Sequence, residues 1–199
     1  LQYEPPALAP ILEAFLSRGS TFVDVGANVG VYTGWASRCV GEDGRVVAFE
    51  PLPATRENLQ RVVAANALGN VRVVPKALGA AAGAVKLWAV PNASGLTSAV
   101  PPADTTGATS VEVPMSTLDD ELAAAGATSV ALVKIDVEGY EMAVLEGAAR
   151  TLSAPRAPAV LFETQQDHLA RSGVRFADIP AWFEDRFGYS VFALLPSGL

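Results

Sequence analysis

The stretch 21–30 constrains the fold most, because it joins a short apolar run to a turn bounded by glycines. The run contains aromatic and β-branched residues that favour a buried strand: Phe22, Val23 and Val25. Gly26 and Gly30 allow backbone conformations that a Cβ would forbid, and they let a ligand approach the main chain closely. The residues after Gly30 are expected to open a helix whose free N–H groups face the same space. The stretch therefore predicts a strand, a tight turn and a nucleotide-type ligand site.

The composition of this turn favours a cationic or zwitterionic ligand over a pyrophosphate. Asp24 places a carboxylate close to the helix N-terminus, where it would repel an anion. In addition, Asn28 stands where the dinucleotide pattern G-x-G-x-x-G has its second glycine. On this stretch alone, a purely structural turn without a ligand is an equal alternative.

Strands and helices are expected to alternate along the chain. The expected strands are 22–25, 45–49, 71–74, 130–135, 159–162 and 189–195, and the expected helices are 3–18, 32–39, 53–68, 118–125, 142–152 and 176–187. Such alternation predicts an α/β fold with a mostly parallel central sheet, helices on both faces and ligands at the carboxyl ends of the strands.

The length of 199 residues fits one domain, which we expect to cover residues 1–199 and to begin with an N-terminal helix within 1–19. Residues 79–114 interrupt the pattern with two short strands that flank a loop at 92–107 rich in small and polar residues. This insertion is either a plain surface feature or a substrate lid. In the second case we expect the loop to be mobile and to order over a bound acceptor.

Charge and hydropathy narrow the class of partner. A net charge of −7 disfavours nucleic acid, which proteins bind mainly through Lys and Arg patches. The apolar runs are too short to span a membrane. Cys39 is the single cysteine and can form no intrachain disulfide, which fits a reducing compartment. We therefore expect a cytoplasmic protein that acts on a small molecule.

Glu50 follows the second expected strand and is a candidate for cofactor binding. A carboxylate at this place can accept hydrogen bonds from the hydroxyls of a ribose. This geometry suits any adenosine-containing ligand, so only the turn discriminates between candidates. There, Asp24 favours S-adenosylmethionine, which carries an ammonium and a sulfonium group.

A group of ionisable residues follows the central strands and contains the candidate catalytic groups. Lys134, Asp136 and Glu138 alternate, so they point the same way if the strand stays extended. They form either a salt-bridge network or one wall of the ligand cleft. With Glu163 after the next strand, the carboxylates can supply a general base, or Asp136 and Glu163 can hold a divalent cation such as Mg²⁺. His168, the only histidine, is a further candidate base.

Five short motifs occur in an order and spacing that is specific, although each motif alone is generic. They are FVDVGANVG at 22–30, FEP at 49–51, ALG at 77–79, TLD at 117–119 and KIDVEG at 134–139. This combination resembles the FkbM family of S-adenosylmethionine-dependent methyltransferases.

The resemblance implies a Rossmann-like methyltransferase fold and O-methylation of small molecules such as glycosides, polyketides or other secondary metabolites. It also implies that the turn lies under the methionine moiety of the cofactor and that Glu50 binds its ribose. The expected cofactor-binding residues are Asp24, Gly26, Asn28, Gly30, Glu50, Pro51, Lys76, Ala77 and Asp136.

Two other classes of function stay open at this point. A nicotinamide-dependent oxidoreductase would need the glycine that Asn28 replaces. A non-catalytic nucleotide-binding module would leave Asp24 and Glu50 without a role.

Overall fold

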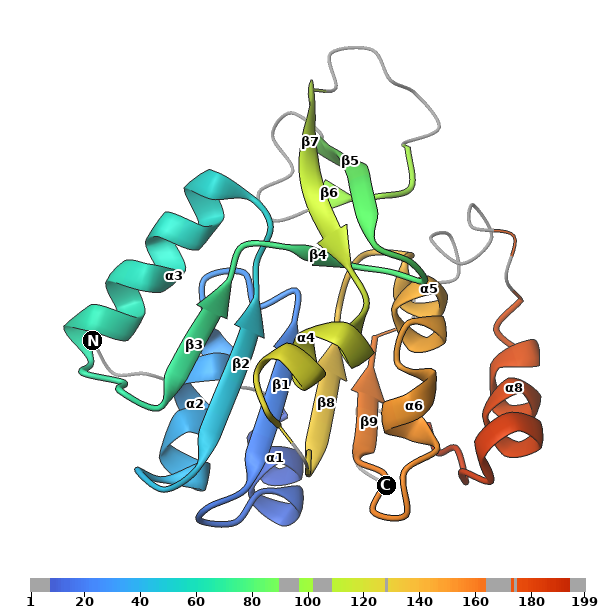
Figure 1. Ribbon diagram of the computed structural model, residues 1–199, viewed down its shortest axis with the longest axis horizontal. Coiled ribbons are helices and arrows are strands. Elements are labelled where there is room, and N and C mark those ends of the chain that lie inside the picture. Colours follow the sequence, from blue (N-terminus) through green and yellow to red (C-terminus); the bar gives the residue numbers. More distant parts are fainter. Residues whose placement is uncertain are drawn as a thin grey trace.

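A parallel five-stranded sheet forms the centre of the computed structural model, which describes residues 8–89, 97–101, 109–127, 129–163, 173 and 175–193 (Figure 1). Its strands are β1 (Thr21–Val25), β2 (Arg45–Phe49), β3 (Val71–Val74), β8 (Leu132–Ile135) and β9 (Ala159–Phe162). They lie in the order β3-β2-β1-β8-β9, and every neighbouring pair is parallel. The chain order reverses between β1 and β8, so the carboxyl ends of these two strands form the switch point at which α/β sheets bind ligands.

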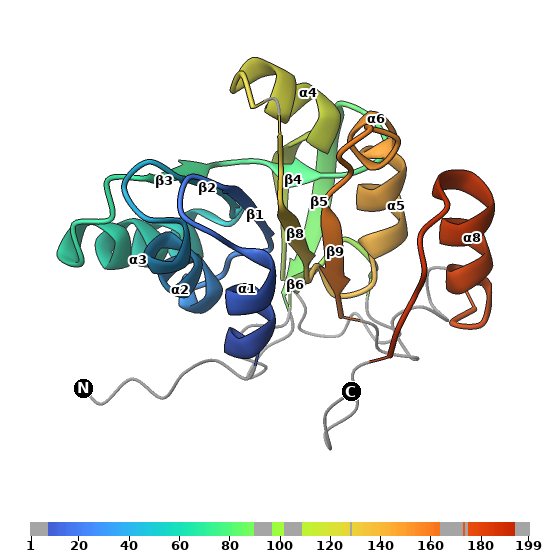
Figure 2. The ribbon, with the colours of Figure 1, turned by 90° about the horizontal axis from the view of Figure 1, so that it is seen from below.

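Helices cover both faces of this sheet, as the sequence predicts (Figure 2). One face carries α1 (Ala9–Phe15), α2 (Val31–Val40) and α3 (Pro53–Ala65), and the other carries α4 (Leu118–Ala124), α5 (Glu141–Glu146), α6 (Ala149–Leu152) and α8 (Asp178–Phe187). Thr117 caps α4, because its side chain accepts a hydrogen bond from the N–H of Asp120 at 3.1 Å. No helix in these described ranges is long and apolar enough to cross a membrane.

The alternation of side chains along β1 divides the core into two layers. Phe22 packs with α1 and α2, whereas Val23 and Val25 pack with the helices of the opposite face. All three side chains are buried. Asp24 lies two residues after Phe22, so its side chain points to the same face of the sheet. Its carboxylate therefore faces α2 rather than the carboxyl end of the sheet.

A second, smaller sheet stands above the carboxyl ends of the parallel strands (Figure 1). It contains β4 (Ala77–Leu78), β5 (Gly83–Ala89), β6 (Thr97–Ser98) and β7 (Thr109–Ser116), in the order β4-β7-β5-β6. The two strands expected within 79–114 are thus present as the antiparallel pair of β5 and β7. Of the loop at 92–107, only residues 97–101 are among those described.

Three expected elements differ from those observed. The single helix expected at 142–152 is split into α5 and α6. At the break the carbonyl of Gly147 accepts a hydrogen bond from the N–H of Asp119 at 3.1 Å, and the N–H of Thr151 donates to Asp119 Oδ1 at 2.9 Å. The strand expected at 189–195 is wrong for residues 189–193, which form no ladder. Instead Tyr189 packs on the core and donates a hydrogen bond to the carbonyl of Pro158 at 2.8 Å. The first helix begins at Ala9, and residues 1–7 lie outside the described chain.

Candidate active site

A cavity of about 220 Å³ lies at the carboxyl ends of β1, β2 and β8, beneath the second sheet. Most of the wall residues come from four segments. They are the turn after β1 with Gly26, Asn28 and Val29, the end of β2 with Glu50, Pro51 and Leu52, the turn after β8 with Asp136, Val137, Glu138 and Tyr140, and the insertion with Val85, Leu87 and Ala99. The fold therefore brings together motifs that are up to about a hundred residues apart.

The two glycines of the first turn have different tasks. Gly26 has a φ of 76°, and a Cβ there would collide with the backbone carbonyl oxygen of Asp136, so this position forms the floor of the cavity. Asn28 also has a positive φ, of 50°, which asparagine tolerates better than most residues. Gly30 does not line the cavity. It has a φ of 89° and lies against Leu59 of α3.

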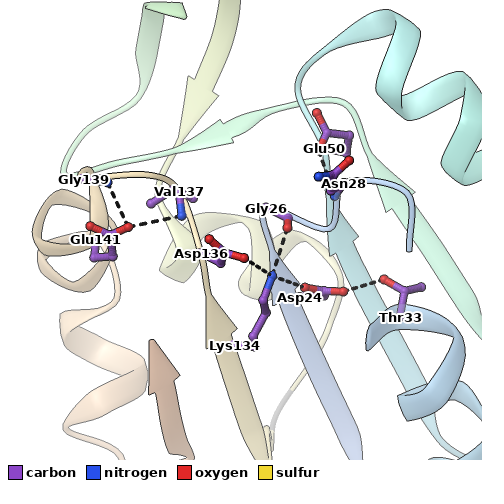
Figure 3. A network of polar contacts seen from close by, with 10 residues as sticks. All are labelled: Asp24, Gly26, Asn28, Thr33, Glu50, Lys134, Asp136, Val137, Gly139 and Glu141. Carbon is purple, nitrogen blue, oxygen red and sulfur yellow. Dashed lines mark hydrogen bonds and ion pairs between the residues drawn. The ribbon is translucent and has the colours of Figure 1, made fainter. Parts of the chain in front are cut away.

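Glu50 is fixed at the cavity wall by two backbone N–H groups. Its Oε2 accepts a hydrogen bond from the N–H of Asn28 at 3.0 Å (Figure 3). Its Oε1 accepts one from the N–H of Leu52 at 2.9 Å. The side chain is buried, and burial raises the pKa of Glu50 despite these two hydrogen bonds. Each oxygen keeps a lone pair, so the carboxylate can accept further hydrogen bonds from a ligand.

Lys134 is a buried cation that links β1, the first turn and β8 (Figure 3). Its Nζ lies 3.3 Å from Asp24 Oδ1 and 3.3 Å from Asp136 Oδ2, and it donates to the carbonyl of Gly26 at 3.0 Å. Burial alone lowers the pKa of Lys134, but attraction to the two carboxylates outweighs burial and raises it. The salt-bridge network considered above is therefore present.

The two carboxylates of this network have different surroundings. Asp24 is fully buried, accepts a hydrogen bond from Thr33 Oγ1 at 2.6 Å and does not line the cavity. Its predicted contact with the cofactor stays a prediction, and the partners that the structure gives it are Lys134 and Thr33. Asp136 lines the cavity and keeps 31% of its side chain exposed, so it alone of the two faces both Lys134 and a ligand.

The turn after β8 brings Glu138 to the cavity by a route that the sequence does not predict. The expected alternation of Lys134, Asp136 and Glu138 fails, because β8 ends at Ile135 and Glu138 has a positive φ of 56°. Glu138 is nevertheless one of the residues that line the cavity.

Pro51, Lys76 and Ala77 line the same cavity. Lys76 is also engaged elsewhere, since its Nζ donates to Oε1 of Glu121 at 2.6 Å. Burial alone raises the pKa of Glu121, but this bond and one from Ser116 outweigh burial and lower it.

Of the remaining predicted catalytic and metal-binding residues, only Glu163 is described, and it does not line the cavity. Glu163 is exposed at the end of β9, and its N–H donates to the carbonyl of Ile135 at 3.1 Å. His168 lies outside the described residues. Within the ranges that the structure describes, no group of three or more His, Cys, Asp or Glu side chains is placed to hold a metal ion. Asp136 and Glu163 come directly after Ile135 and Phe162, which are paired across β8 and β9. The carboxylate of Asp136, however, forms an ion pair with Lys134.

Two residues near the cavity were missed by sequence reasoning. Tyr32, at the start of α2, lies with its ring centroid 5.3 Å from Lys134 Nζ. Burial raises the pKa of its hydroxyl, with smaller effects from Lys134, Asp136 and Glu163. Glu141 has a buried carboxylate at the start of α5. A glutamate in the first turn of a helix, two residues after a glycine, is the signal that could have identified it.

Comparisons with known proteins agree with this geometry. The description "Methyltransferase FkbM domain" belongs to the family model that matches residues 24–191. The chain is 31% identical over 153 residues to methyltransferase sdnD from Sordaria araneosa, which covers 63% of this chain and 59% of that protein.

Two solved structures share the fold. The methyltransferase FkbM of Methylobacillus flagellatus KT matches with a TM-score of 0.56 and 18% identity, over 85% of this chain and 38% of that one. A SAM-dependent methyltransferase from Aquifex aeolicus matches with a TM-score of 0.51 and 17% identity, over 96% of this chain and 87% of that one. The chain thus spans less than two thirds of both sdnD and the Methylobacillus protein.

Proposed function

The chain belongs to the FkbM family of methyltransferases, and from this premise we propose that it transfers a methyl group from S-adenosylmethionine to a hydroxyl of a small molecule. The observation that carries the proposal is Glu50. Two backbone amides hold its buried carboxylate at the wall of the cavity, where it can accept hydrogen bonds from the two ribose hydroxyls. The broken dinucleotide pattern at Asn28 supports the same cofactor over NAD.

The floor of the cavity fits the cofactor's amino acid end. Gly26 lies there against the backbone carbonyl of Asp136, so the lack of a Cβ lets the turns after β1 and β8 meet beneath the ligand. Asp136 and Glu138 supply negative charge beside a ligand that carries an ammonium and a sulfonium. When bound, S-adenosylmethionine supplies a methyl group on a positively charged sulfur.

The carboxylates after β8 are the groups that we propose for the acceptor. An in-line displacement requires the acceptor oxygen to be about 3 Å from the methyl carbon and its proton to be removed. Asp136 is held in place by Lys134 and can orient a hydroxyl. Glu138 is a candidate base at the same wall, and Glu163 and His168 stay predicted participants.

The second sheet is proposed to cover the acceptor. Val85, Leu87 and Ala99 of the insertion form an apolar roof over the cavity, as expected of a lid that excludes water. An acceptor from secondary metabolism and a cytoplasmic location belong to the same proposal. The free thiol of Cys39 supports a reducing compartment.

A thermal-shift comparison tests the cofactor first. S-adenosylmethionine and S-adenosylhomocysteine are expected to raise the melting temperature and NAD to leave it unchanged. Calorimetry with S-adenosylhomocysteine then compares Glu50→Ala with Glu57→Ala, an exposed glutamate of α3. The first variant is expected to bind about 10- to 150-fold more weakly, because a hydrogen bond to a charged group is lost. Equal affinities in these two variants, or stabilisation by NAD instead, would contradict the proposal.

A further inference from the structure

The turn between β8 and α5 has a conformation that its residues do not favour by themselves. Glu138 has a φ of 56° and Gly139 a φ of 102°. A glutamate rarely adopts the left-handed region, because its Cβ then crowds the carbonyl oxygen. Such a conformation persists only where surrounding contacts enforce it.

The first enforcing contact comes from Glu141, the first residue of α5 (Figure 3). One oxygen, Oε1, accepts hydrogen bonds from the N–H of Gly139 at 3.0 Å and from the N–H of Val137 at 3.2 Å. The side chain is 4% exposed, and burial raises the pKa of Glu141. A carboxylate is costly to bury, so these bonds to the turn account for its position.

The second enforcing contact comes from the insertion. Ser98 of β6 donates its hydroxyl hydrogen to the carbonyl of Glu138 at 2.5 Å. The same Oγ accepts a hydrogen bond from the N–H of Val100 at 2.9 Å. Two residues about forty positions apart in the sequence therefore hold the backbone of this turn. Ser98 binds the carbonyl of Glu138, and Glu141 binds the N–H groups of Val137 and Gly139.

Both contacts act on residues that form the cavity. Asp136, Val137, Glu138 and Tyr140 are all lining residues, and Ala99, next to Ser98, lines the cavity from above. The carbonyl of Asp136 also lies against Gly26 in the floor. A shift of the turn would consequently move one wall, disturb the floor and separate the roof from the wall.

We infer that Glu141 and Ser98 are positioning residues, which hold the 136–140 turn so that Asp136 and Glu138 face the cavity and the insertion stays closed over it. Neither side chain needs to touch substrate for this role. The inference rests on the proposed function, because the value of a fixed turn lies in the ligand that it encloses.

Hydrogen exchange without any ligand tests the contact of Glu141. Glu141→Ala is expected to speed exchange of the Gly139 amide at least tenfold, whereas Glu141→Gln retains an oxygen acceptor and should stay within about threefold of the parent. Glu146→Ala, an exposed glutamate of the same helix, is the control. Exchange at Gly139 that is as slow in Glu141→Ala as in this control would overturn the inference.

Calorimetry with S-adenosylhomocysteine tests the consequence for binding and uses a variant that keeps the core intact. Ser98→Ala is expected to weaken binding roughly threefold to tenfold, as for one lost hydrogen bond, at an unchanged melting temperature. Ser98→Thr keeps the hydroxyl and should restore affinity. Ser110→Ala is the control, since Ser110 pairs with Trp88 from the other side and is exposed.

The outcomes separate the two proposals. Parental affinity in Ser98→Ala, or a loss that Ser98→Thr does not restore, would overturn the positioning role. If the parent protein binds neither S-adenosylhomocysteine nor S-adenosylmethionine, the proposed function fails. The exchange rates at Gly139 then still decide whether Glu141 holds the turn.

Discussion

Replacement of Lys134 by methionine tests the electrostatic centre of the site. Methionine keeps the length and the apolar stem of lysine, but it removes the cation that lies 3.3 Å from both Asp24 and Asp136. Asp24 is fully buried and, among the residues that the structure describes, would retain the hydroxyl of Thr33 as its hydrogen-bond donor. Breaking a buried ion pair by removing one partner costs about 3–5 kcal/mol. Loss of the ion pair with Asp136 contributes less to this cost, because 31% of the Asp136 side chain is exposed to water.

The expected result is a fall in melting temperature of roughly 6–20 °C, given about 2–4 °C per kcal/mol for a domain of this size. Lys86→Met, an exposed lysine of β5, is the matched control and should change it little. The double variant Asp24→Asn/Lys134→Met should recover at least half of the loss, because no buried charge is left unpaired and the amide oxygen still accepts from Thr33. A Lys134→Met protein that melts within about 2 °C of the parent would refute this reasoning.

Three further outcomes are expected. Affinity for S-adenosylhomocysteine should fall on acidification, since burial raises the pKa of Glu50 above its usual value and the ionised acceptor is lost as the pH drops through that raised value. Calorimetry at a series of pH values checks this expectation, and the affinity of Glu50→Gln should depend less on pH. Gly26→Ala should abolish measurable binding, because its Cβ would collide with the carbonyl of Asp136, whereas Gly34→Ala, with open space around it in α2, should bind normally and gain up to about 1 kcal/mol of stability. Thr117→Ala should lower the free energy of unfolding by about 1 kcal/mol in urea titration, through loss of the α4 cap.

Several elements could be predicted from local sequence alone. The bounds of β2, β3 and β9 agree with the expected strands 45–49, 71–74 and 159–162. These runs are apolar and stop at a proline or a charged residue. Each strand and its end can therefore be recognised from residues within it or next to it in the sequence. The cap at Thr117 is local in the same sense.

Elements that depend on distant partners were predicted less well. The helix after β8 reads as continuous, but it is divided where backbone groups of Gly147 and Thr151 hydrogen-bond to Asp119, about thirty residues away. Residues 189–193 have the apolar character of a strand, yet they do not join the sheet, and only Tyr189 and Val191 of this segment pack on the core. Periodicity reports which residues are buried, and it does not report which neighbour buries them.

The sequence by itself determined the parallel α/β fold, the glycine turn, the place of Glu50 and the family. Strand ends, glycines and motif spacing can all be recognised from residues that are close together in the sequence. Only the tertiary structure decided which groups the charged side chains of the site contact. The contact of Asp24 with the cofactor stays a prediction, and the structure adds that its side chain, on the same face of β1 as Phe22, pairs with Lys134. The sequence pattern assigned no role to Glu141, whereas the structure buries its carboxylate against the turn at Gly139. Side-chain direction and burial follow from how elements pack, so the electrostatic roles at this site arise only when β1, β8 and the insertion meet.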